Sequence, residues 1–268
     1  MKGVSQMYEQ LYASLPNKEA YLERISIKVV ERLGLEDLNV LILAHQCAIP
    51  FENLDIYEYD KDINLGIAKL FEKVINQKRG GYCFELNALF MALLQECGFD
   101  VYACNCRIVR GKDFIPPSLH RGTIVKLSGR LWFADVGYGG PMPAGALLVE
   151  DGYEITYCGQ TFKVNREDEY WWTIIYISSK GSETIMQFTT MPQEVVEFVS
   201  PNEYCSKNEM SVFRNVRLVN RRTSKGSLAI TGDLFTEISE GRRNEKKIQS
   251  PEELNQILKD YFNIDLPQ

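Results

Sequence analysis

The sequence predicts an α+β protein built from three successive segments, residues 1–98, 99–200 and 201–268. Apolar residues recur at helix spacing through the first segment, which indicates several helices. Aromatic and β-branched runs separated by turn dipeptides fill the second, which indicates antiparallel strands. Helix and strand patterns mix in the third.

The most distinct element of the first segment is a helix expected from about Tyr82 to Glu96. Its apolar residues follow helix periodicity, and Gly98 directly after it suits a C-terminal cap. The helix begins just after the pair Gly80-Gly81, which permits close backbone approach. A cysteine, Cys83, therefore lies in its first turn.

The second segment is punctuated by dipeptides that suit tight reversals, so consecutive strands should pair as antiparallel hairpins in a sheet or small barrel. These dipeptides are Ser128-Gly129, Asp151-Gly152, Cys158-Gly159 and Lys180-Gly181. In the third segment, Ser211 to Asn220 and Leu228 to Thr231 are expected to be strands, and the charged run Glu240 to Lys247 a solvated loop. Ser250-Pro251 opens a last helix with an N-cap serine and proline at the first helical position.

Composition excludes several classes of protein. The chain has 268 residues with 30 Lys plus Arg against 36 Asp plus Glu, and a net charge of −6 argues against nucleic-acid binding. No run of about 20 apolar residues is present, and the first 18 residues lack the apolar region of a secretion signal, so no membrane partner and a cytoplasmic location are expected. Seven irregularly spaced cysteines and two histidines favour neither a disulfide framework nor a metal site.

Cys83 is the first candidate for chemistry. The unpaired N–H groups and the positive dipole end of a helix N-terminus stabilise a thiolate, so a lowered thiol pKa and a partly exposed nucleophile are expected. The alternative is that Cys83 is a small buried apolar residue like other cysteines in the chain. The choice depends on whether a base and an orienting group lie nearby.

His120 and Asp135 supply that pair if Ser128-Gly129 forms a two-residue hairpin loop. Paired residue numbers then sum to 257, so Asp135 faces Gly122, two positions from His120 on the same side of the sheet. The two side chains become diagonal neighbours within hydrogen-bond reach. Cys83, His120 and Asp135 are thus the candidate catalytic residues.

Other polar features have weaker signals. His45, near a helix end, is interpreted as a capping or packing residue. Gly137, Gly139 and Gly140 offer backbone amides to an anion. They do not form a dinucleotide-binding motif, since position 142 is Met, and the chain contains no Walker A sequence.

Several blocks, in order along the chain, resemble the bacterial arylamine N-acetyltransferases. They are Ile49 to Leu54, the R-G-G-x-C-x-E-x-N block from Arg79 to Asn87, Cys97-Gly98-Phe99, Arg107 to Val109, His120, the D-V-G-[FY]-G block from Asp135 to Gly139, and Asn202 to Phe213. The chain departs from the family pattern at Pro116-Pro117 and at Tyr138, where phenylalanine is frequent. These departures bear on substrate preference.

The resemblance implies a helical bundle carrying the nucleophile, an antiparallel β-barrel carrying His120 and Asp135, and a C-terminal α/β lid, with a cysteine-peptidase-like core. It implies acetyl-CoA as co-substrate, no metal, and an aromatic amine or hydrazine as acceptor. Cys83 would carry the acetyl group as a thioester in a ping-pong reaction. His120 would hold the thiolate as an ion pair or take its proton, and Asp135 would orient and stabilise the imidazolium.

The resemblance also implies roles outside the triad. Phe51 and Tyr138 would contact the acceptor, while Gly137, Gly139 and Gly140 would face the CoA pyrophosphate and Tyr204 its nucleotide end. Phe51 could equally be a core residue. Arg79 and Glu85 are expected to pair and brace the start of the helix.

Three alternatives stay open at this point. A transglutaminase-like or cysteine-peptidase acyl transferase uses the same three residue types in the same order. An amide synthase on a related fold is a closer alternative, and a non-catalytic binding module is a third. The acceptor amine, the preferred acyl-CoA and the oligomeric state are not determined by the sequence.

Overall fold

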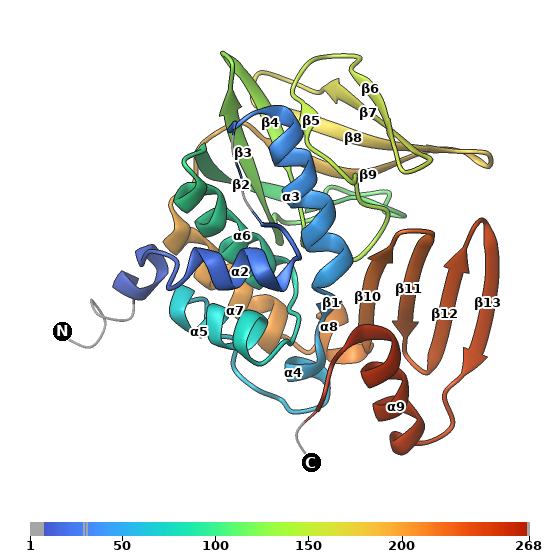
Figure 1. The fold of residues 1–268 in the computed structure, drawn as a ribbon. Coiled ribbons are helices and arrows are strands. Elements are labelled where there is room, and N and C mark those ends of the chain that lie inside the picture. The colour runs from blue at the N-terminus through green and yellow to red at the C-terminus, as the bar shows by residue number, and fades with distance from the viewer. Residues whose placement is uncertain (1–7, 29, 31, 267–268) are drawn as a thin grey trace.

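The computed structural model describes residues 8–28, 30 and 32–266, and Figure 1 shows helices, a curled sheet and a smaller second sheet. The leading 1–7, on which part of the signal-peptide expectation rested, lie outside the described residues. The first group of elements is helical: η1 Gln10–Tyr12, α2 Lys18–Arg24, α3 Leu35–Ala48, α4 Leu54–Tyr57, α5 Ile67–Phe71, the π-turn η2 Glu72–Asn76 and α6 Cys83–Cys97.

Helix α6 is the central element of the molecule. All residues from Cys83 to Leu94 are buried, because other helices pack on one side and the barrel strands on the other. Gly98 ends the helix in a left-handed conformation with φ of 97°. The helix predicted over residues 82–96 is therefore confirmed.

The second group is an eight-stranded antiparallel sheet that curls into a nearly closed barrel, with order β5-β4-β3-β2-β9-β8-β7-β6. Its two ends approach where the Tyr157 hydroxyl donates to the Ala146 carbonyl over 3.0 Å. The strands are β2 Asp100–Ile108, β3 His120–Leu127, β4 Arg130–Ala134, β5 Leu147–Leu148, β6 Glu154–Tyr157, β7 Gln160–Arg166, β8 Trp171–Ser178 and β9 Gly181–Thr189.

The hairpin between β3 and β4 has the predicted register. Leu127 pairs with Arg130 and Thr123 with Ala134, so paired numbers sum to 257. The loop residues Ser128 and Gly129 have φ of 53° and 72°, as a two-residue turn with two left-handed positions requires. This register determines on which side of the sheet each side chain of β3 and β4 lies.

The third group is a five-stranded sheet with one face covered by α9 Pro251–Phe262. Its strands are β1 Phe51–Glu52, β10 Leu218–Thr223, β11 Gly226–Thr231, β12 Leu234–Ser239 and β13 Arg242–Lys247. Ser250 caps α9 as predicted, by accepting from the N–H of Glu253. The solvated loop expected over residues 240–247 was wrong, because β13 adds to the sheet as a fully exposed edge strand.

Between the barrel and this sheet, the chain returns to the first helices. The segments η3 Val195–Phe198, α7 Val199–Lys207 and α8 Val212–Asn215 lie among them in Figure 1. The rings of Phe198 and Phe84 are 6.2 Å apart, and Asn202 accepts from the hydroxyl of Tyr82. The strand expected over residues 211–220 was wrong in its first half, where Ser211 caps the short helix α8.

The expected α+β fold of helical bundle, antiparallel barrel and C-terminal α/β unit is confirmed. The seven cysteines all lie within the described residues, and none forms a disulfide. Across residues 8–28, 30 and 32–266, no helix is both long and apolar enough to cross a membrane. The same residues contain no group of three or more His, Cys, Asp or Glu side chains that could hold a metal ion.

Candidate active site

His120 and Asp135 form a buried hydrogen-bonded pair at the start of β3 and the end of β4. The distance from His120 Nε2 to Asp135 Oδ2 is 2.6 Å, and the two side chains are 3% and 2% exposed. An ionised carboxylate only accepts hydrogen bonds, so the Nε2 atom carries the proton and donates. The diagonal contact predicted from the hairpin register is confirmed.

Asp135 is held by two further donors. Asn87 Nδ2 donates to Oδ1 over 2.8 Å, and the Gly137 N–H donates to the same oxygen over 2.7 Å. Burial alone would raise the pKa of this carboxyl, but His120 and these donors hold the pKa of Asp135 below its usual value. The carboxylate is therefore charged at neutral pH and fixed in orientation.

Cys83 opens α6 and is buried, with 2% of its surface exposed. Its sulfur lies 4.0 Å from the carbonyl oxygen of Leu119, the residue before His120. The backbone N–H groups of Phe84 and Arg121 favour the thiolate, but burial outweighs them and raises the pKa of the Cys83 thiol well above its usual value. The lowered pKa and the partial exposure expected from the helix position were both wrong.

The hairpin backbone rests directly on the first turns of α6. A Cβ atom at Gly137 would lie 2.8 Å from Cys83 Cα and 2.9 Å from Asn87 Nδ2, so only glycine fits there. Asn87, one turn after Cys83, also donates to the Arg121 carbonyl over 2.6 Å and accepts from the Val136 N–H. These contacts bring Cys83 and the His120–Asp135 pair into one buried cluster.

Two aromatic residues predicted to contact the acceptor lie beside this cluster. The Tyr138 ring meets the His120 ring edge to face, with centroids 6.1 Å apart. Phe51 is buried and lies against Gly139, where a Cβ atom would come within 2.8 Å of its ring. A Cβ atom at Gly140 would clash with Tyr138 in the same way. The glycines of this loop therefore let two rings pack closely.

Tyr204 is not part of this group. It lies on α7 with 42% of its surface exposed, and its carbonyl accepts from the Asn208 N–H at the end of the same helix. Within the described residues, no hydrogen bond, ion pair or ring contact joins Tyr204 to another candidate. His45 lies in the core instead, with Nδ1 2.7 Å from the Tyr21 hydroxyl and its ring against Phe90.

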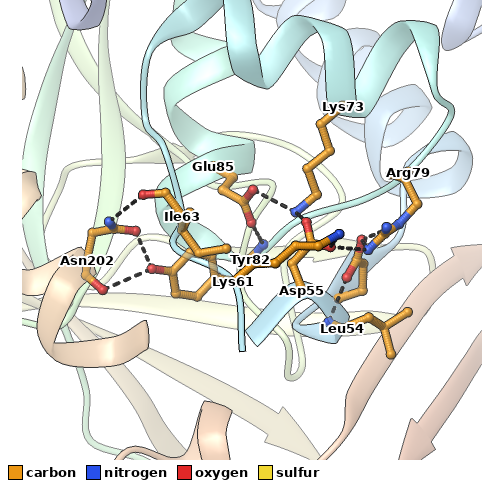
Figure 2. Close-up of polar contacts among 10 residues, drawn as sticks. Leu54, Asp55, Lys61, Ile63, Lys73, Arg79, Tyr82, Glu85 and Asn202 are labelled. Atoms are coloured by element: carbon orange, nitrogen blue, oxygen red, sulfur yellow. Dashed lines mark hydrogen bonds and ion pairs between the residues drawn. The ribbon is translucent and has the colours of Figure 1, made fainter. Parts of the chain in front are cut away.

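A chain of charged side chains, some buried and some partly buried, lies beside the start of α6 (Figure 2). Arg79 binds the carboxylate of Glu52 at 2.8 Å and that of Asp55 at 3.2 Å. Lys73 binds Asp55 at 2.9 Å and Glu85 at 2.7 Å. The direct pair expected between Arg79 and Glu85 was wrong, because Asp55 and Lys73 lie between them. We call these five residues the buried ion chain.

The pair Gly80-Gly81 is required by close packing of the ion chain. A Cβ atom at Gly80 would lie 2.0 Å from the Pro50 carbonyl oxygen, and one at Gly81 would lie 2.8 Å from a carboxylate oxygen of Glu85. Asn87, Lys73 and Glu52 belong to the site but were not predicted from the sequence. The position of Asn87, one helical turn after Cys83, could have indicated that it belongs to the site. Nothing in the sequence around Lys73 indicates this.

The chain resembles known N-acetyltransferases over most of its length. The model of the N-acetyltransferase family matches residues 34–268. The arylamine N-acetyltransferase of Escherichia coli is 30% identical over 91% of this chain and 87% of that protein.

Solved structures show the same fold. The arylamine N-acetyltransferase from Salmonella typhimurium superposes with a TM-score of 0.90 at 28% identity, covering 96% of this chain and 94% of that one. The Mycobacterium marinum enzyme, solved in complex with CoA, superposes with a TM-score of 0.84 over 92% of this chain and 93% of that one. Its identity is 23%, so this likeness concerns the fold alone.

Proposed function

The chain belongs to the arylamine N-acetyltransferase family, and from this premise we propose that it moves an acetyl group from acetyl-CoA to an aromatic amine or hydrazine through Cys83. The observation that carries the mechanism is the hydrogen-bonded series from Asn87 through Asp135 to His120. The Cys83 sulfur lies 4.0 Å from the carbonyl oxygen of Leu119, the residue before His120. A thiol, a base and an orienting carboxylate are the three groups that nucleophilic acyl transfer needs.

In the first half-reaction, His120 takes the thiol proton as the Cys83 sulfur attacks the thioester carbonyl of acetyl-CoA. His120 Nε2 is held by Asp135, which leaves Nδ1 as the base. The tetrahedral intermediate then breaks its bond to the CoA sulfur, and the departing thiolate recovers the proton from the imidazolium. The products are acetyl-Cys83 and free CoA.

In the second half-reaction, the amine nitrogen attacks the acetyl-Cys83 carbonyl. His120 removes the proton that the amine loses on acylation and returns it to the departing Cys83 sulfur. CoA leaves before the amine enters, so ping-pong kinetics are expected. Asp135 stabilises the imidazolium that forms in both halves, as a buried ionised carboxylate can.

The raised pKa of Cys83 bears on how the thiol is activated. Because burial disfavours the free thiolate, the proton passes to His120 during attack rather than long before it. Acetyl-cysteine is neutral, so the same burial does not oppose the intermediate. The site therefore suits a covalent thioester better than a resting anion.

The substrate contacts are part of the proposal. Phe51 and Tyr138 flank the cluster and offer aromatic surface to a flat amine. Gly139 and Gly140 are proposed to face the CoA pyrophosphate, together with Gly137, although the N–H of Gly137 already donates to Asp135. Tyr204, exposed on α7, is proposed for the nucleotide end.

Intact mass spectrometry after mixing with acetyl-CoA alone tests this function. We expect a gain of one acetyl group, located on Cys83 by peptide mapping and lost when an arylamine is added. The matched control is Cys205→Ala, which removes another buried cysteine and should still be acetylated. If the protein gains no acetyl group, or gains it in Cys83→Ala, the proposed mechanism is refuted.

We also propose a domain division and a cellular location. The first is the division into residues 1–98, 99–200 and 201–268, supported by the sheet formed from residues 100–189 and tested by limited proteolysis. The second is a cytoplasmic location, which cell fractionation would test. Cleavage within β2 to β9, or recovery with the membrane fraction, would contradict them.

A further inference from the structure

We infer that Lys73 is a positioning residue for this reaction, because its ammonium holds the Glu85 carboxylate on the backbone amide that precedes Cys83. The inference rests on the proposed function, in which Cys83 is the nucleophile. Lys73 lies ten residues before Cys83, in the π-turn η2, and outside every motif that the sequence analysis singled out. Only the tertiary structure brings it to the site.

The contacts form a short path from Lys73 through Glu85 to Tyr82, the residue before Cys83 (Figure 2). Lys73 Nζ lies 2.7 Å from Glu85 Oε1, and the other oxygen, Oε2, accepts from the Tyr82 N–H over 3.0 Å. Tyr82 is the residue before Cys83 and the N-cap of α6. One carboxylate therefore joins the ammonium to the peptide that sets the direction of the first helical turn.

Glu85 is buried enough to need a cationic partner. Its side chain is 4% exposed, and that of Lys73 is 14% exposed. Burial raises the pKa of Glu85, and the ammonium of Lys73 opposes that rise. Without Lys73, the buried carboxylate would lose its cationic partner, which favours its movement toward water and away from the Tyr82 N–H.

The rest of the buried ion chain leaves little room for another arrangement. Arg79 is already engaged by Glu52 and Asp55, so it is not free to replace Lys73 at Glu85. The buried ion chain holds three carboxylates and two cations, so loss of Lys73 would make it more negative at the first turn of α6, which Cys83 opens. A more negative surrounding disfavours the thiolate that attack requires.

The other end of Tyr82 is fixed independently of Lys73. Its hydroxyl donates to Asn202 on α7, and Asn202 Nδ2 donates to the Ile63 carbonyl over 3.1 Å. Loss of Lys73 should therefore release the backbone amide of Tyr82 while the ring stays in place. The expected consequence is a local change at the first turn of α6 and not a general loss of structure.

The test measures alkylation of Cys83 by iodoacetamide, with peptide mass spectrometry, over a range of pH. In Lys73→Met we expect the rate at pH 7 to fall at least tenfold and the midpoint of the pH profile to move to higher pH. Lys61→Met is the matched control: Lys61 also pairs with Asp55, at 3.6 Å, but does not touch Glu85. Its rate should stay within twofold of the unmodified protein.

The double variant Lys73→Met/Glu85→Gln separates positioning from stability. A neutral amide oxygen still accepts from the Tyr82 N–H, so the double variant should recover to within about threefold of the unmodified protein. A role in stability alone would leave the double variant as slow as the single one, with an unmoved pH profile. That result, or a Lys73→Met rate equal to the control, would overturn the inference.

Alkylation needs no acetyl-CoA, so the role of Lys73 is tested separately from acetyl transfer. If the unmodified protein is not acetylated on Cys83 but Lys73→Met still shows the expected alkylation change, the proposed function fails and the positioning role stands. If acetylation occurs and Lys73→Met alkylates normally, the positioning role fails and the proposed function stands.

Discussion

Asn87 donates a hydrogen bond of 2.8 Å to the carboxylate of Asp135 and thereby ties the helix that carries Cys83 to the hairpin that carries His120. The same amide also donates to the Arg121 carbonyl and accepts from the Val136 N–H. One buried side chain therefore sets the distance between the candidate nucleophile and its base. Its position, one helical turn after Cys83, makes this possible.

Replacing Asn87 by Ala should impair both catalysis and stability. The loss leaves the Arg121 carbonyl and the Val136 N–H without a partner, which costs about 1–3 kcal/mol of stability. Asp135 loses one of its donors, so kcat/KM should fall about 10- to 100-fold through misplacement of His120. Steady-state kinetics and urea unfolding measure both effects, and a variant with unchanged kcat/KM would contradict this role.

Asp135→Asn should nearly abolish turnover while keeping the fold. A neutral amide neither favours the imidazolium nor enforces the proton on Nε2 of His120, and the loss in comparable triads is about 10⁴-fold in kcat. Near-UV circular dichroism checks that the packing is intact. Retention of more than a tenth of the activity would show that His120 does not depend on this carboxylate.

Gly137→Ala should separate the hairpin from α6. The new methyl group would lie 2.8 Å from Cys83 Cα, in a site with no free space. Overpacking of this kind costs about 1–3 kcal/mol, and alkylation of Cys83 should change with it. Gly34→Ala is the control, since nothing lies within 4 Å of its added methyl group and its φ of −103° is ordinary. Equal stability of the two variants would contradict the packing.

Acid should destabilise the protein through His45. Burial lowers the pKa of His45 to about 3, against about 6.5 in an unfolded chain. Between these pH values the unfolded state binds more protons than the folded state. The stability that depends on a neutral, buried His45 is therefore fully present above about pH 6.5. It is lost as the pH falls, by up to about 1.4 kcal/mol per pH unit.

The measurement is urea unfolding at pH 7, 6 and 5, where Asp135 stays ionised because its pKa is lowered. His45→Gln should show a shallower dependence of the free energy of unfolding on pH than the unmodified protein. Parallel curves for the two proteins would mean that His45 is not the residue responsible.

Much of the site could be predicted from the sequence because it depends on local rules. The β3–β4 register follows from a two-residue turn at Ser128-Gly129, and it places His120 beside Asp135 without knowledge of the rest of the chain. The start of α6 at Cys83 follows from the glycines before it and the apolar period after it. Short-range geometry of this kind is encoded within a few residues.

Tertiary structure decided the properties that depend on what packs around these elements. Position at a helix N-terminus indicates a low thiol pKa, but the barrel covers Cys83, and desolvation reverses the direction. Tyr204 and Cys205 are neighbours in sequence, yet one is exposed and the other buried, because α7 turns one face to the core. The partner of Glu85 is Lys73 and not Arg79, since burial and charge compensation depend on residues that only the folded chain brings together.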